Sequence, residues 1–409
     1  MKILGMIVEY NPFHNGHKYH LKKSMEITGA EYSVAVMSGD FTQRGEIALL
    51  DKWSRSRLAV ENGVDLVLEL PFTFACNRGE LFASGAVDIL QGIGITDISF
   101  GSECGDIETL RELADAIISD SDRLIEIRKE RMRSGVSFAR AFHIAVEERL
   151  GKDKASLLTS PNNILAVEYL KRISYWRHTG HMIRAFTIKR EGAGYREADD
   201  ESGMAGASAI RDMIMTGAEG LGMLEKYMPE DVVQEILRCS DIQNAEKRAF
   251  LLLKGQLTRM SSDELSQIYC MGEGLENKFK KEIIKADSMA EFVSCLVSRR
   301  YTEAAVKRLI IYILTGLKKN YAEADMPVYA RVLAAGKRGR QLLNIIKKND
   351  IASIPVITNI NRYKEISMPT EDILKYDILA SDIYNIINGR NLYGFSDRVV
   401  RPYISQQLL

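Results

Sequence analysis

The sequence predicts an α/β protein with an N-terminal, doubly wound parallel sheet and a mainly helical C-terminal region. In residues 1–215, short apolar runs alternate with segments of helical periodicity, which is typical of parallel strands joined by crossover helices. These runs are continuous rather than alternating in polarity, as expected of strands buried on both faces. After residue 215, helical periodicity dominates over long stretches without Pro.

The first region is expected to hold four strands and two clear helices. The strands are Ile3–Val8, Tyr32–Met37, Asp65–Leu70 and the short Ile98–Phe100. The helices are His17–Thr28, between the first two strands, and Lys52–Asn62, before the third.

The second region is expected to be built mainly from helices, at Glu230–Arg238, Ala245–Leu257, Ala304–Leu317 and Asp372–Ile387. One late segment, Ile354–Thr358, reads as a strand. Its Pro355 has no N–H to donate and restricts it to a sheet edge. We place the boundary near Thr216-Gly217, so the predicted domains are residues 1–215 and 216–409.

Composition narrows the class of protein. Of 409 residues, 46% are apolar and 27% are charged, which is ordinary for a globular protein with its own core. Basic and acidic residues both number 55, which excludes a globally basic nucleic-acid coat but not a local basic patch. The five cysteines form no CxxC pair, and no apolar run is long enough to span a membrane. We expect a reduced, cytoplasmic protein with no membrane partner.

The first strand runs directly into a polar segment, Glu9-Tyr10-Asn11-Pro12-Phe13-His14-Asn15-Gly16-His17, that opens the first helix. Parallel sheets bind ligands at this edge, and a helix N-terminus attracts anions. Gly16 would let a ligand approach the backbone, and one helical turn places His14 and His17 on the same side. Two imidazoles there can stabilise the charge that develops as pyrophosphate leaves.

Two other interpretations of this segment remain open. It can be an ordinary helix start with two surface histidines. A metal centre of His14, His17 and His20 is disfavoured, because no Cys or acidic cluster completes a ligand shell, and we predict no metal ligands.

The segment resembles the HxGH signature of the nucleotidylyltransferase superfamily. That superfamily has a second signature, a Ser-containing turn ending in Ile-Arg, and this chain carries Ala207-Ser208-Ala209-Ile210-Arg211. The guanidinium of an arginine is well suited to phosphate oxygens. The resemblance therefore implies catalytic roles for His14, His17, Ser208 and Arg211.

Further segments are similar to the tRNA(Met) cytidine acetate ligase family: VEYNPFHNGHKYHL, SGDFTQRGEIALLDKWSRSRLAVENGVDLVLELP, FGSE, SPNNILAVEYL, TIKREGAGY, SRRYTEAAVKRLI and VYARVLAAGKRGRQLL. The resemblance implies a nucleotidylyltransferase-like domain of the HIGH type. It further implies that ATP and acetate give acetyl-adenylate, and that the acetyl group then passes to the wobble cytidine of elongator tRNA(Met) as N4-acetylcytidine. We expect Mg²⁺ to accompany ATP.

The ATP site implied by the resemblance comprises Ile7, Val8, Glu9, Tyr10, Asn11, Pro12, Phe13, His14, Asn15, Gly16, His17, Lys18, Tyr19 and His20, together with Gly101, Asn162 and Arg190. Gly101 follows a strand where a side chain would block a nucleotide, or is a plain turn glycine. Asn162 can contact ligand or simply cap a helix. Arg190 can bind phosphate or be solvated beside Lys189.

Five further residues, Glu9, Asp40, Asp51, Lys52 and Trp53, lie near the expected cleft in the sequence pattern. Glu9 can hold Mg²⁺ or orient His14. Asp51, Lys52 and Trp53 open the second helix and can line the same cleft, or form a solvent-facing cap with one core aromatic. Asp40 stands where the family resemblance leads us to expect Asn or another polar residue, and its role is not readable.

A basic segment runs from Arg299 to Lys348. The segment contains twelve basic residues and three acidic ones, Glu303, Glu323 and Asp325, so its local net charge is 12 minus 3, or +9. Such a stripe favours an RNA backbone, and the interleaved Tyr301, Tyr312, Tyr321 and Tyr329 can stack on bases. The alternative is a solvated helical face with its tyrosines in the core. The tRNA-binding residues we predict are Arg299, Arg300, Lys307, Arg308, Lys337, Arg338 and Arg340.

Other functions share part of this pattern. A metabolite adenylyltransferase would carry both signatures, but such enzymes are usually compact single domains without a basic helical half. A non-catalytic RNA-binding protein would not need His14, His17, Ser208 and Arg211 together. An amino-acid synthetase is weaker still, because no Lys-Met-Ser-Lys-Ser-like loop occurs.

Overall fold

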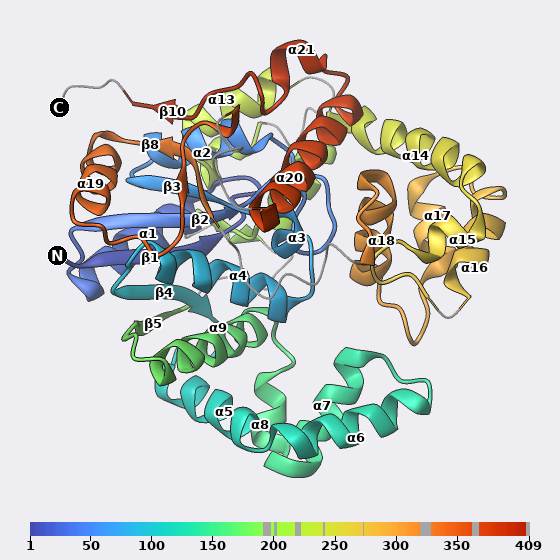
Figure 1. The fold of residues 1–409 in the computed structure, drawn as a ribbon, viewed down its shortest axis with the longest axis horizontal. Coiled ribbons are helices and arrows are strands. Elements are labelled where there is room, and N and C mark those ends of the chain that lie inside the picture. Colours follow the sequence, from blue (N-terminus) through green and yellow to red (C-terminus); the bar gives the residue numbers. More distant parts are fainter. Residues whose placement is uncertain are drawn as a thin grey trace.

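A mostly parallel β-sheet forms the centre of the molecule (Figure 1). The computed structural model describes residues 1–190, 198–199, 203–216, 222–239, 242–272, 274–319, 329–361 and 368–405. The sheet order is β10-β8-β3-β2-β1-β4-β5. Its strands are β1 (Ile3–Val8), β2 (Tyr32–Ser38), β3 (Leu66–Leu70), β4 (Asp97–Ser102), β5 (Arg184–Lys189), β8 (Ala330–Ala335) and β10 (Tyr403–Ile404). A separate antiparallel pair joins β6 (Ala198–Asp199) and β7 (Met204–Ala205).

The strand order reverses at β1, which lies between β2 and β4 and is parallel to both. In open α/β sheets, ligands bind beyond the carboxyl ends of the strands at such a reversal. The segment that begins at Glu9 leaves β1 at this point, so the topology itself points to the predicted motif.

Helices cover both faces of the sheet, which explains why its strands are apolar throughout. Alternate residues of β1 and β2 enter different cores: Ile3 and Val36 face one, while Leu4 and Met37 face the other. The first face is covered by α4 (Gly79–Gly92), α5 (Ile107–Ser119), α9 (Pro161–His178) and α19 (Lys337–Lys348). The second is covered by α1 (Asn15–Thr28), α2 (Lys52–Glu61), α10 (Ala207–Met215), α12 (Leu224–Tyr227) and α13 (Glu230–Arg238). The doubly wound prediction is confirmed.

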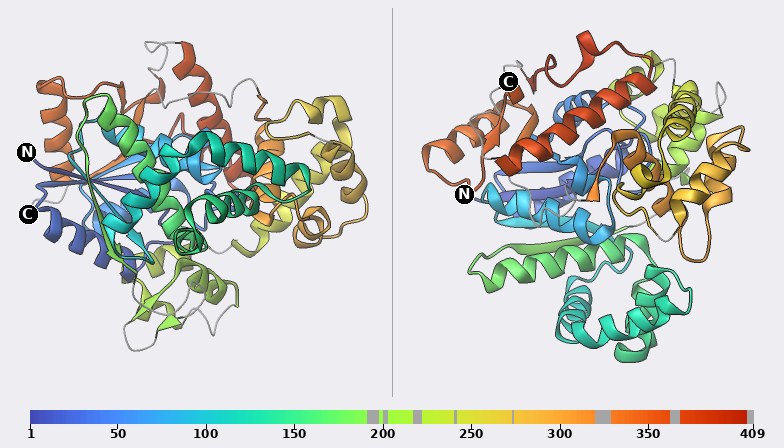
Figure 2. Two further views of the ribbon diagram at one scale, coloured as in Figure 1. Left: turned by 90° about the horizontal axis from the view of Figure 1, so that it is seen from below. Right: turned by 45° about the vertical axis from the view of Figure 1, so that its right-hand side comes forward.

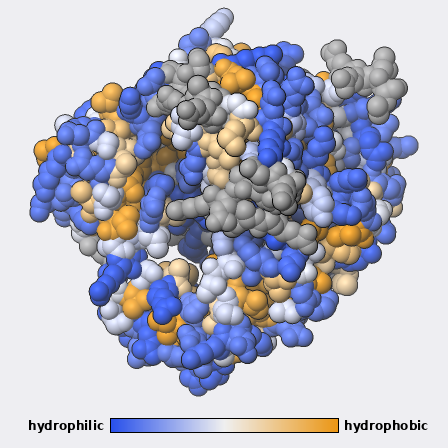
Figure 3. Space-filling view, turned by 180° about the vertical axis from the view of Figure 1, so that it is seen from behind, coloured by the Kyte–Doolittle hydropathy of each residue, from blue (hydrophilic) through white to orange (hydrophobic). Residues whose placement is uncertain are grey.

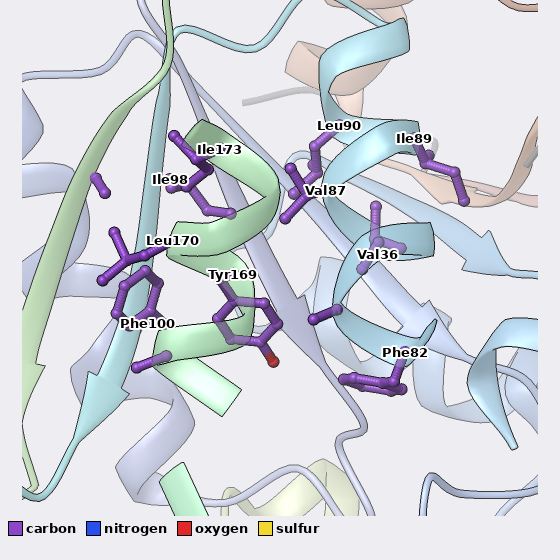
Figure 4. Close-up of a cluster of buried hydrophobic side chains, with 14 of the residues drawn as sticks. Val36, Phe82, Val87, Ile89, Leu90, Ile98, Phe100, Tyr169, Leu170 and Ile173 are labelled. Carbon is purple, nitrogen blue, oxygen red and sulfur yellow. The ribbon is translucent and has the colours of Figure 1, made fainter. Parts of the chain in front are cut away.

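Figure 4 shows the first of these cores, where α4 and α9 meet over the sheet. The side chains in contact there include Phe82, Val87 and Leu90 of α4, Tyr169, Leu170 and Ile173 of α9, and Val36, Ile98 and Phe100 of the strands.

Two helical lobes flank this layered centre. Below it in Figure 1 lie α6 (Ser121–Arg133), α7 (Phe138–Leu150) and α8 (Lys152–Leu157), next to α5. To the right lie α14 (Ile242–Arg259), α15 (Ser262–Ser266), α16 (Leu275–Ile283), α17 (Met289–Leu296) and α18 (Glu303–Thr315). The right-hand view of Figure 2 shows the same two lobes separated from the centre. The second lobe shares a core with Phe41 and Phe72, near the short α3 (Phe72–Ala75), and with α20 (Met368–Ile387).

The chain after residue 216 does not stay outside the sheet. β8 pairs antiparallel with β3, and β10 and the two-residue β9 (Val356–Ile357) pair parallel with β8. The prediction of an edge strand around Pro355 is confirmed, but β8 was not predicted. Its sequence, Ala-Arg-Val-Leu-Ala-Ala, carries a charge in a run of good helix formers, and a buried ion cluster described below accommodates that charge. The predicted domain boundary, whose Gly217 lies outside the described residues, therefore does not delimit the sheet.

Other differences are at element ends. α1 begins at Asn15, two residues before the predicted His17, because His14 caps it. β4 runs from Asp97 to Ser102, longer than the predicted Ile98–Phe100, because it pairs with the unpredicted β5 along its whole length. In the part of the chain that the structure describes, no helix has the length and apolarity to cross a membrane.

Candidate active site

The turn after β1 folds the two histidines onto each other. Tyr10 has a positive φ of 47°, and the chain then enters α1 with His14 as its N-cap residue. His14 Nδ1 accepts a hydrogen bond from Gly16 N at 3.1 Å, and His17 Nδ1 accepts one from His14 N at 3.2 Å. The two ring centroids are 3.7 Å apart. Since both Nδ1 atoms are acceptors, both rings carry their proton on Nε2 and can donate from it.

Burial keeps these rings neutral. It lowers the pKa of His14 to about 3, and Arg190 adds to the effect. Burial likewise lowers the pKa of His17 well below its usual value, with His14, Arg190 and His20 contributing. At pH 7 the pair can therefore donate hydrogen bonds to an anion without being ionised beforehand.

Gly16 makes room for a neighbouring side chain. A Cβ atom at this position would lie 2.9 Å from His14 Cε1, so Gly16 leaves room for the His14 ring to fold back over the helix N-terminus. The rings of Tyr10 and Phe13 pack near the histidine pair. The Tyr10 and Phe13 rings are 4.8 Å apart, and the Tyr10 ring lies 4.9 Å from that of His17.

Two buried polar atoms of this segment have no hydrogen-bond partner, His20 Nε2 and Asn11 Nδ2. The other amide atom of Asn11, Oδ1, is held by Leu49 N at 2.9 Å. Unpaired buried donors are rare in folded proteins and need an explanation. A polar ligand in the segment that we call the phosphate cradle, residues 7–20, would supply the missing partners.

The second motif meets the first, as predicted. Arg211, on α10, donates from Nη1 to the carbonyl of Asn11 at 3.0 Å and from Nη2 to Ser208 Oγ at 3.2 Å. Its Nη2 also lies 3.2 Å from Glu46 Oε2. Asn15 Nδ2 ties the start of α1 to the carbonyls of Gly203 and Lys226, at 3.2 and 3.0 Å. The structure therefore brings Ser208 and Arg211 to the cradle.

Gly101 and Arg190 lie together beside the cradle. Arg190 N donates to Ser102 O at 2.9 Å, which extends the pairing of β4 and β5. A Cβ atom on Gly101 would lie 3.2 Å from Arg190 Cγ. Gly101 thus makes room for the arginine stem, and the charge of Arg190 contributes to lowering the pKa of His14, His17 and His20.

Asn162 is engaged with a residue that the sequence did not single out. Glu103 accepts from Asn162 Nδ2 at 2.8 Å and from Asn163 N at 2.9 Å, so its carboxylate caps α9. Negative charge at a helix N-terminus is stabilising. Glu103 stands in the segment FGSE, but its spacing alone does not indicate this role.

Glu9 is a partly buried carboxylate directly after β1. Its Oε1 accepts from Gln43 N at 2.7 Å and from Ser38 Oγ at 3.2 Å. Burial raises its pKa, and the bond from Gln43 opposes that shift. Among the described residues, the hydrogen bonds of Glu9 go to Gln43 and Ser38 and not to His14, so Glu9 does not orient that ring by a direct hydrogen bond. Lys18 and Tyr19, also in the predicted ATP site, are exposed on α1, whereas Pro12 and Phe13 are buried and Ile7 and Val8 partly so.

Asp51, Lys52 and Trp53, for which two interpretations were open, are held by ion pairs and hydrogen bonds within the protein. Lys52 Nζ lies 2.6 Å from both Glu69 and Asp397, and Arg331 lies 2.9 and 2.7 Å from the same two carboxylates. These four side chains, which we call the ion cluster, are almost fully buried. Trp53 Nε1 donates to Asp397, and Asp51 pairs with Arg390 at 2.7 Å.

Asp40 has a structural role at the same place. Its Oδ1 accepts from Lys52 N at 2.7 Å, which fixes the start of α2. Burial raises the pKa of Asp40 to about 6, although Lys52 and Arg55 oppose that shift.

The predicted basic surface is divided into two groups. Arg299, Arg300, Lys307 and Arg308 lie at or on α18, while Lys337, Arg338 and Arg340 lie on α19, well apart in Figures 1 and 2. Arg331, counted in the basic stripe, is buried in the ion cluster. Tyr312 and Tyr329 are also buried, so they cannot stack on RNA bases; Tyr321, Glu323 and Asp325 lie outside the described residues.

Among the described residues, no three His, Cys, Asp or Glu side chains gather as a metal-binding group.

Seen from behind, the surface is hollowed between the lower lobe and the body above it (Figure 3).

Comparisons with known proteins agree with this geometry. Residues 1–396 match the family described as HIGH Nucleotidyl Transferase. The tRNA(Met) cytidine acetate ligase of Thermoanaerobacter sp. (strain X514) is 39% identical over 397 residues, which cover 94% of this chain and 95% of that protein. The corresponding protein of Clostridium perfringens (strain SM101 / Type A) is 36% identical over 418 residues, covering 99% and 100%.

Solved structures are similar over the whole length. The crystal structure of Thermotoga maritima TmcAL in its apo form I matches with a TM-score of 0.88 at 31% identity, covering 99% of both chains. The same protein bound with alpha-thio ATP, form II, matches with a TM-score of 0.86 at 31% identity and the same coverage.

Proposed function

The chain belongs to the HIGH nucleotidyl transferase family and, within it, to the tRNA(Met) cytidine acetate ligases, and we propose that it acetylates the wobble cytidine of elongator tRNA(Met). Acetate and ATP first give acetyl-adenylate and pyrophosphate. The acetyl group then passes to the exocyclic amine of the cytidine, giving N4-acetylcytidine and AMP. The enzyme is an ATP-dependent ligase.

One observation carries the proposal. Arg211 donates to the carbonyl of Asn11, 200 residues earlier in the chain. This contact brings a cation to the helix N-terminus where His14 and His17 present their Nε2 donors. Such an arrangement suits a triphosphate that is cleaved at its α-phosphate.

The first step depends on neutralising charge. A carboxylate oxygen of acetate attacks the α-phosphorus, and pyrophosphate leaves. The triphosphate repels acetate, and Arg190 and Arg211 reduce that repulsion while His14 and His17 donate to the developing charge. Ser208, which already bonds Arg211, keeps the guanidinium in place.

Mg²⁺ fits the site only as a partner of the triphosphate. Two carboxylates lie at the cradle and are already engaged. Glu9 accepts a hydrogen bond from Gln43 N, and Glu46 pairs with Arg211. Mg²⁺ usually takes one or two carboxylates together with substrate phosphates and waters. If Mg²⁺ accompanies the triphosphate, Glu9 is the cradle residue that would help to hold it, and the ion would supply further positive charge against the leaving pyrophosphate.

The second step needs no covalent enzyme intermediate, because acetyl-adenylate is already a reactive mixed anhydride. The cytidine amine attacks the carbonyl carbon of acetyl-adenylate and loses a proton. The bond between that carbon and the phosphate oxygen breaks, and AMP leaves. The enzyme has to hold the base close and keep water out.

The tRNA is proposed to contact the two basic groups on α18 and α19. Charge reversal of Lys337 and Arg340 should weaken tRNA binding and reduce its salt dependence, and the same change at Arg299 and Lys307 tests the other group. Unchanged tRNA affinity and an unchanged salt dependence would show that the corresponding basic group does not contact tRNA. Of these residues, Lys307 already pairs with Glu303 at 2.7 Å, so its contribution should be the smaller.

The alternative, a metabolite adenylyltransferase, is less well supported, because the relatives named above match this chain over nearly their whole length. A cytoplasmic location accords with a tRNA substrate.

The decisive experiment incubates the purified protein with tRNA(Met), ATP and labelled acetate, followed by mass analysis of the tRNA nucleosides. We expect N4-acetylcytidine, AMP and pyrophosphate. An oxygen label in acetate should appear in AMP, because the attacking carboxylate oxygen stays on phosphorus when the anhydride opens at carbon. Acetylation with acetyl-CoA alone, or release of ADP, would overturn the proposal.

A further inference from the structure

A second pocket lies beside the cradle, between the two helical lobes. Its volume is about 440 Å³, which is the size of a small-molecule site. Residues from α6, α7 and α9 line one side and residues of α18 line the other, including Arg128, Phe138, Lys171 and Arg308. In Figure 1 these helices approach each other across the space between the lower and right-hand lobes.

One residue that lines this pocket, Gln43, also contacts the cradle. Its backbone N–H donates to Glu9 Oε1 at 2.7 Å. The Gln43 side chain donates to the carbonyl of Asn77, another lining residue, at 3.0 Å. Arg308 donates to the carbonyl of Gln43 at 3.2 Å. A ligand in the pocket would therefore lie next to the site where the adenylate forms.

The pocket is positively charged. The described residues that line it include five cationic side chains, Arg78, Arg128, Lys171, Arg300 and Arg308, and two carboxylates, Glu80 and Glu168. Both carboxylates are already paired with lining cations, Glu80 with Arg78 at 3.1 Å and Glu168 with Lys171 at 2.7 Å. Five cationic side chains against two carboxylates, 5 minus 2, leave these lining residues with a net charge of +3.

Its walls also carry aromatic and apolar surface. Phe138 is 44% exposed, and the Arg128 guanidinium lies 4.5 Å from the centre of its ring. Arg128 Nε is inaccessible to solvent and has no hydrogen-bond partner. Leu158 and Leu309 contribute apolar surface. An exposed aromatic ring beside arginines is the arrangement with which proteins hold unstacked bases and their phosphates.

We propose that this pocket binds an unstacked nucleotide of the tRNA loop that presents the target cytidine. The base packs on Phe138, and the adjoining phosphate lies on Arg128 and its neighbouring arginines. The inference rests on the proposed function and adds the place where the RNA strand enters. Single-stranded RNA is the occupant that the chemistry favours, because ATP has its own site and duplex RNA offers no free base to stack.

The test measures tRNA binding and the adenylation half-reaction separately. Phe138→Ala and Arg128→Ala should each raise the Kd and the KM for tRNA by about tenfold. Arg128→Ala should also reduce the salt dependence of binding, whereas Phe138→Ala should not. Acetate-dependent exchange of pyrophosphate into ATP, measured without tRNA, should remain close to wild type in both.

Matched variants separate stacking from packing and from general charge. Phe138→Tyr keeps the ring and should bind tRNA normally, whereas Phe138→Leu keeps apolar bulk without the ring and should bind weakly. Arg123→Ala removes an exposed arginine from the same helix, α6, outside the pocket, and should behave as wild type. Wild-type tRNA affinity in Phe138→Leu and Arg128→Ala would overturn the proposal that this pocket binds a nucleotide of the tRNA. Absence of acetate-dependent exchange in the wild-type protein would instead overturn the proposed function.

Discussion

The phosphate cradle and the ion cluster are two buried polar regions toward the carboxyl ends of the parallel strands, and they differ in how their polar groups are compensated. In the ion cluster, Lys52 and Arg331 each face Glu69 and Asp397 at 2.6–2.9 Å. In the cradle, Asn11 Nδ2 and His20 Nε2 have no partner. Among the described residues, Glu69 Oε2 and Arg331 Nη2 of the cluster also lack a hydrogen-bond partner, but every side chain of the cluster forms ion pairs with two others, so its charges are balanced within the protein. In the cradle, the unpaired amide and imidazole atoms are available to a polar ligand.

The two regions also differ in how they handle charge. Burial drives the cradle histidines to their neutral form, so that they act as donors rather than as ions. The cluster instead keeps its ions, and its carboxylate Asp397 has a pKa lowered to about 2 by Arg331 and Lys52 despite its burial. Changes in the cluster should therefore affect folding, and changes in the cradle should affect chemistry.

Asp397→Ala should give the largest effect, on stability. It leaves the cations of Lys52 and Arg331 buried with one carboxylate between them. Breaking a buried pair in this way typically costs about 3–5 kcal/mol. We expect the free energy of unfolding, measured by denaturant titration, to fall by about that amount. The surface substitution Glu26→Ala, which removes an exposed partner of Lys23, should unfold at nearly the wild-type denaturant concentration. Equal stability of the two variants would mean that the cluster is not what holds the C-terminal segment.

His17→Ala should act on the reaction and leave the fold intact. Loss of one donor to developing charge typically costs roughly 3 kcal/mol, or on the order of a hundredfold in rate. Acetate-dependent pyrophosphate exchange is the measurement, with thermal unfolding as the control. Near-normal exchange in a folded His17→Ala protein would contradict its role.

The same assay can test whether the two motifs act together. Arg211→Ala should slow the same step. The double variant should lose less than the product of the two single effects, because both groups are proposed to grip the same phosphates. Full additivity would indicate that they act on different atoms or steps.

His20→Gln should change the pH dependence of stability. Burial, with Arg190, lowers the pKa of His20 to about 4, while an unfolded chain binds this proton near pH 6.5. Between these values the unfolded state binds more protons, so the free energy of unfolding falls as pH falls. From pH 7.5 to 5 the wild type should lose about 2 kcal/mol more than His20→Gln, measured by denaturant titration at each pH. Parallel pH profiles would show that His20 is not held neutral.

Glu46→Gln should have the smallest effect. Glu46 pairs with Arg211 at 3.2 Å and lies 4.0 Å from Lys307. A partly exposed pair is worth at most about 1 kcal/mol, so releasing Arg211 should lower the KM for ATP by no more than about fivefold, with kcat little changed. Steady-state exchange kinetics at varied ATP would measure it. A raised KM would mean that Glu46 positions Arg211 for the phosphates instead of competing with them.

The sequence by itself determined the local parts of this protein. Periodicity predicted β1 at Ile3–Val8 and the helix that follows, because strand and helix patterns are set by neighbours a few residues apart. The spacing of His14 and His17 predicted that they would face the same side, and their rings lie 3.7 Å apart. The two superfamily signatures predicted which distant segments would meet there.

Only the tertiary structure decided the features that depend on contacts between residues far apart in the sequence. Asp397 and Lys52 are 345 residues apart, and no pattern near either one indicates that they meet. The strand β8 was missed for the same reason: its Arg331 is tolerated in a sheet only because Glu69 and Asp397 surround it. The basic stripe, continuous in sequence, divides between α18 and α19 because the intervening chain returns to the sheet. Local patterns specify which elements form, whereas the pairing of buried charges and the division of a surface depend on the elements packed against them.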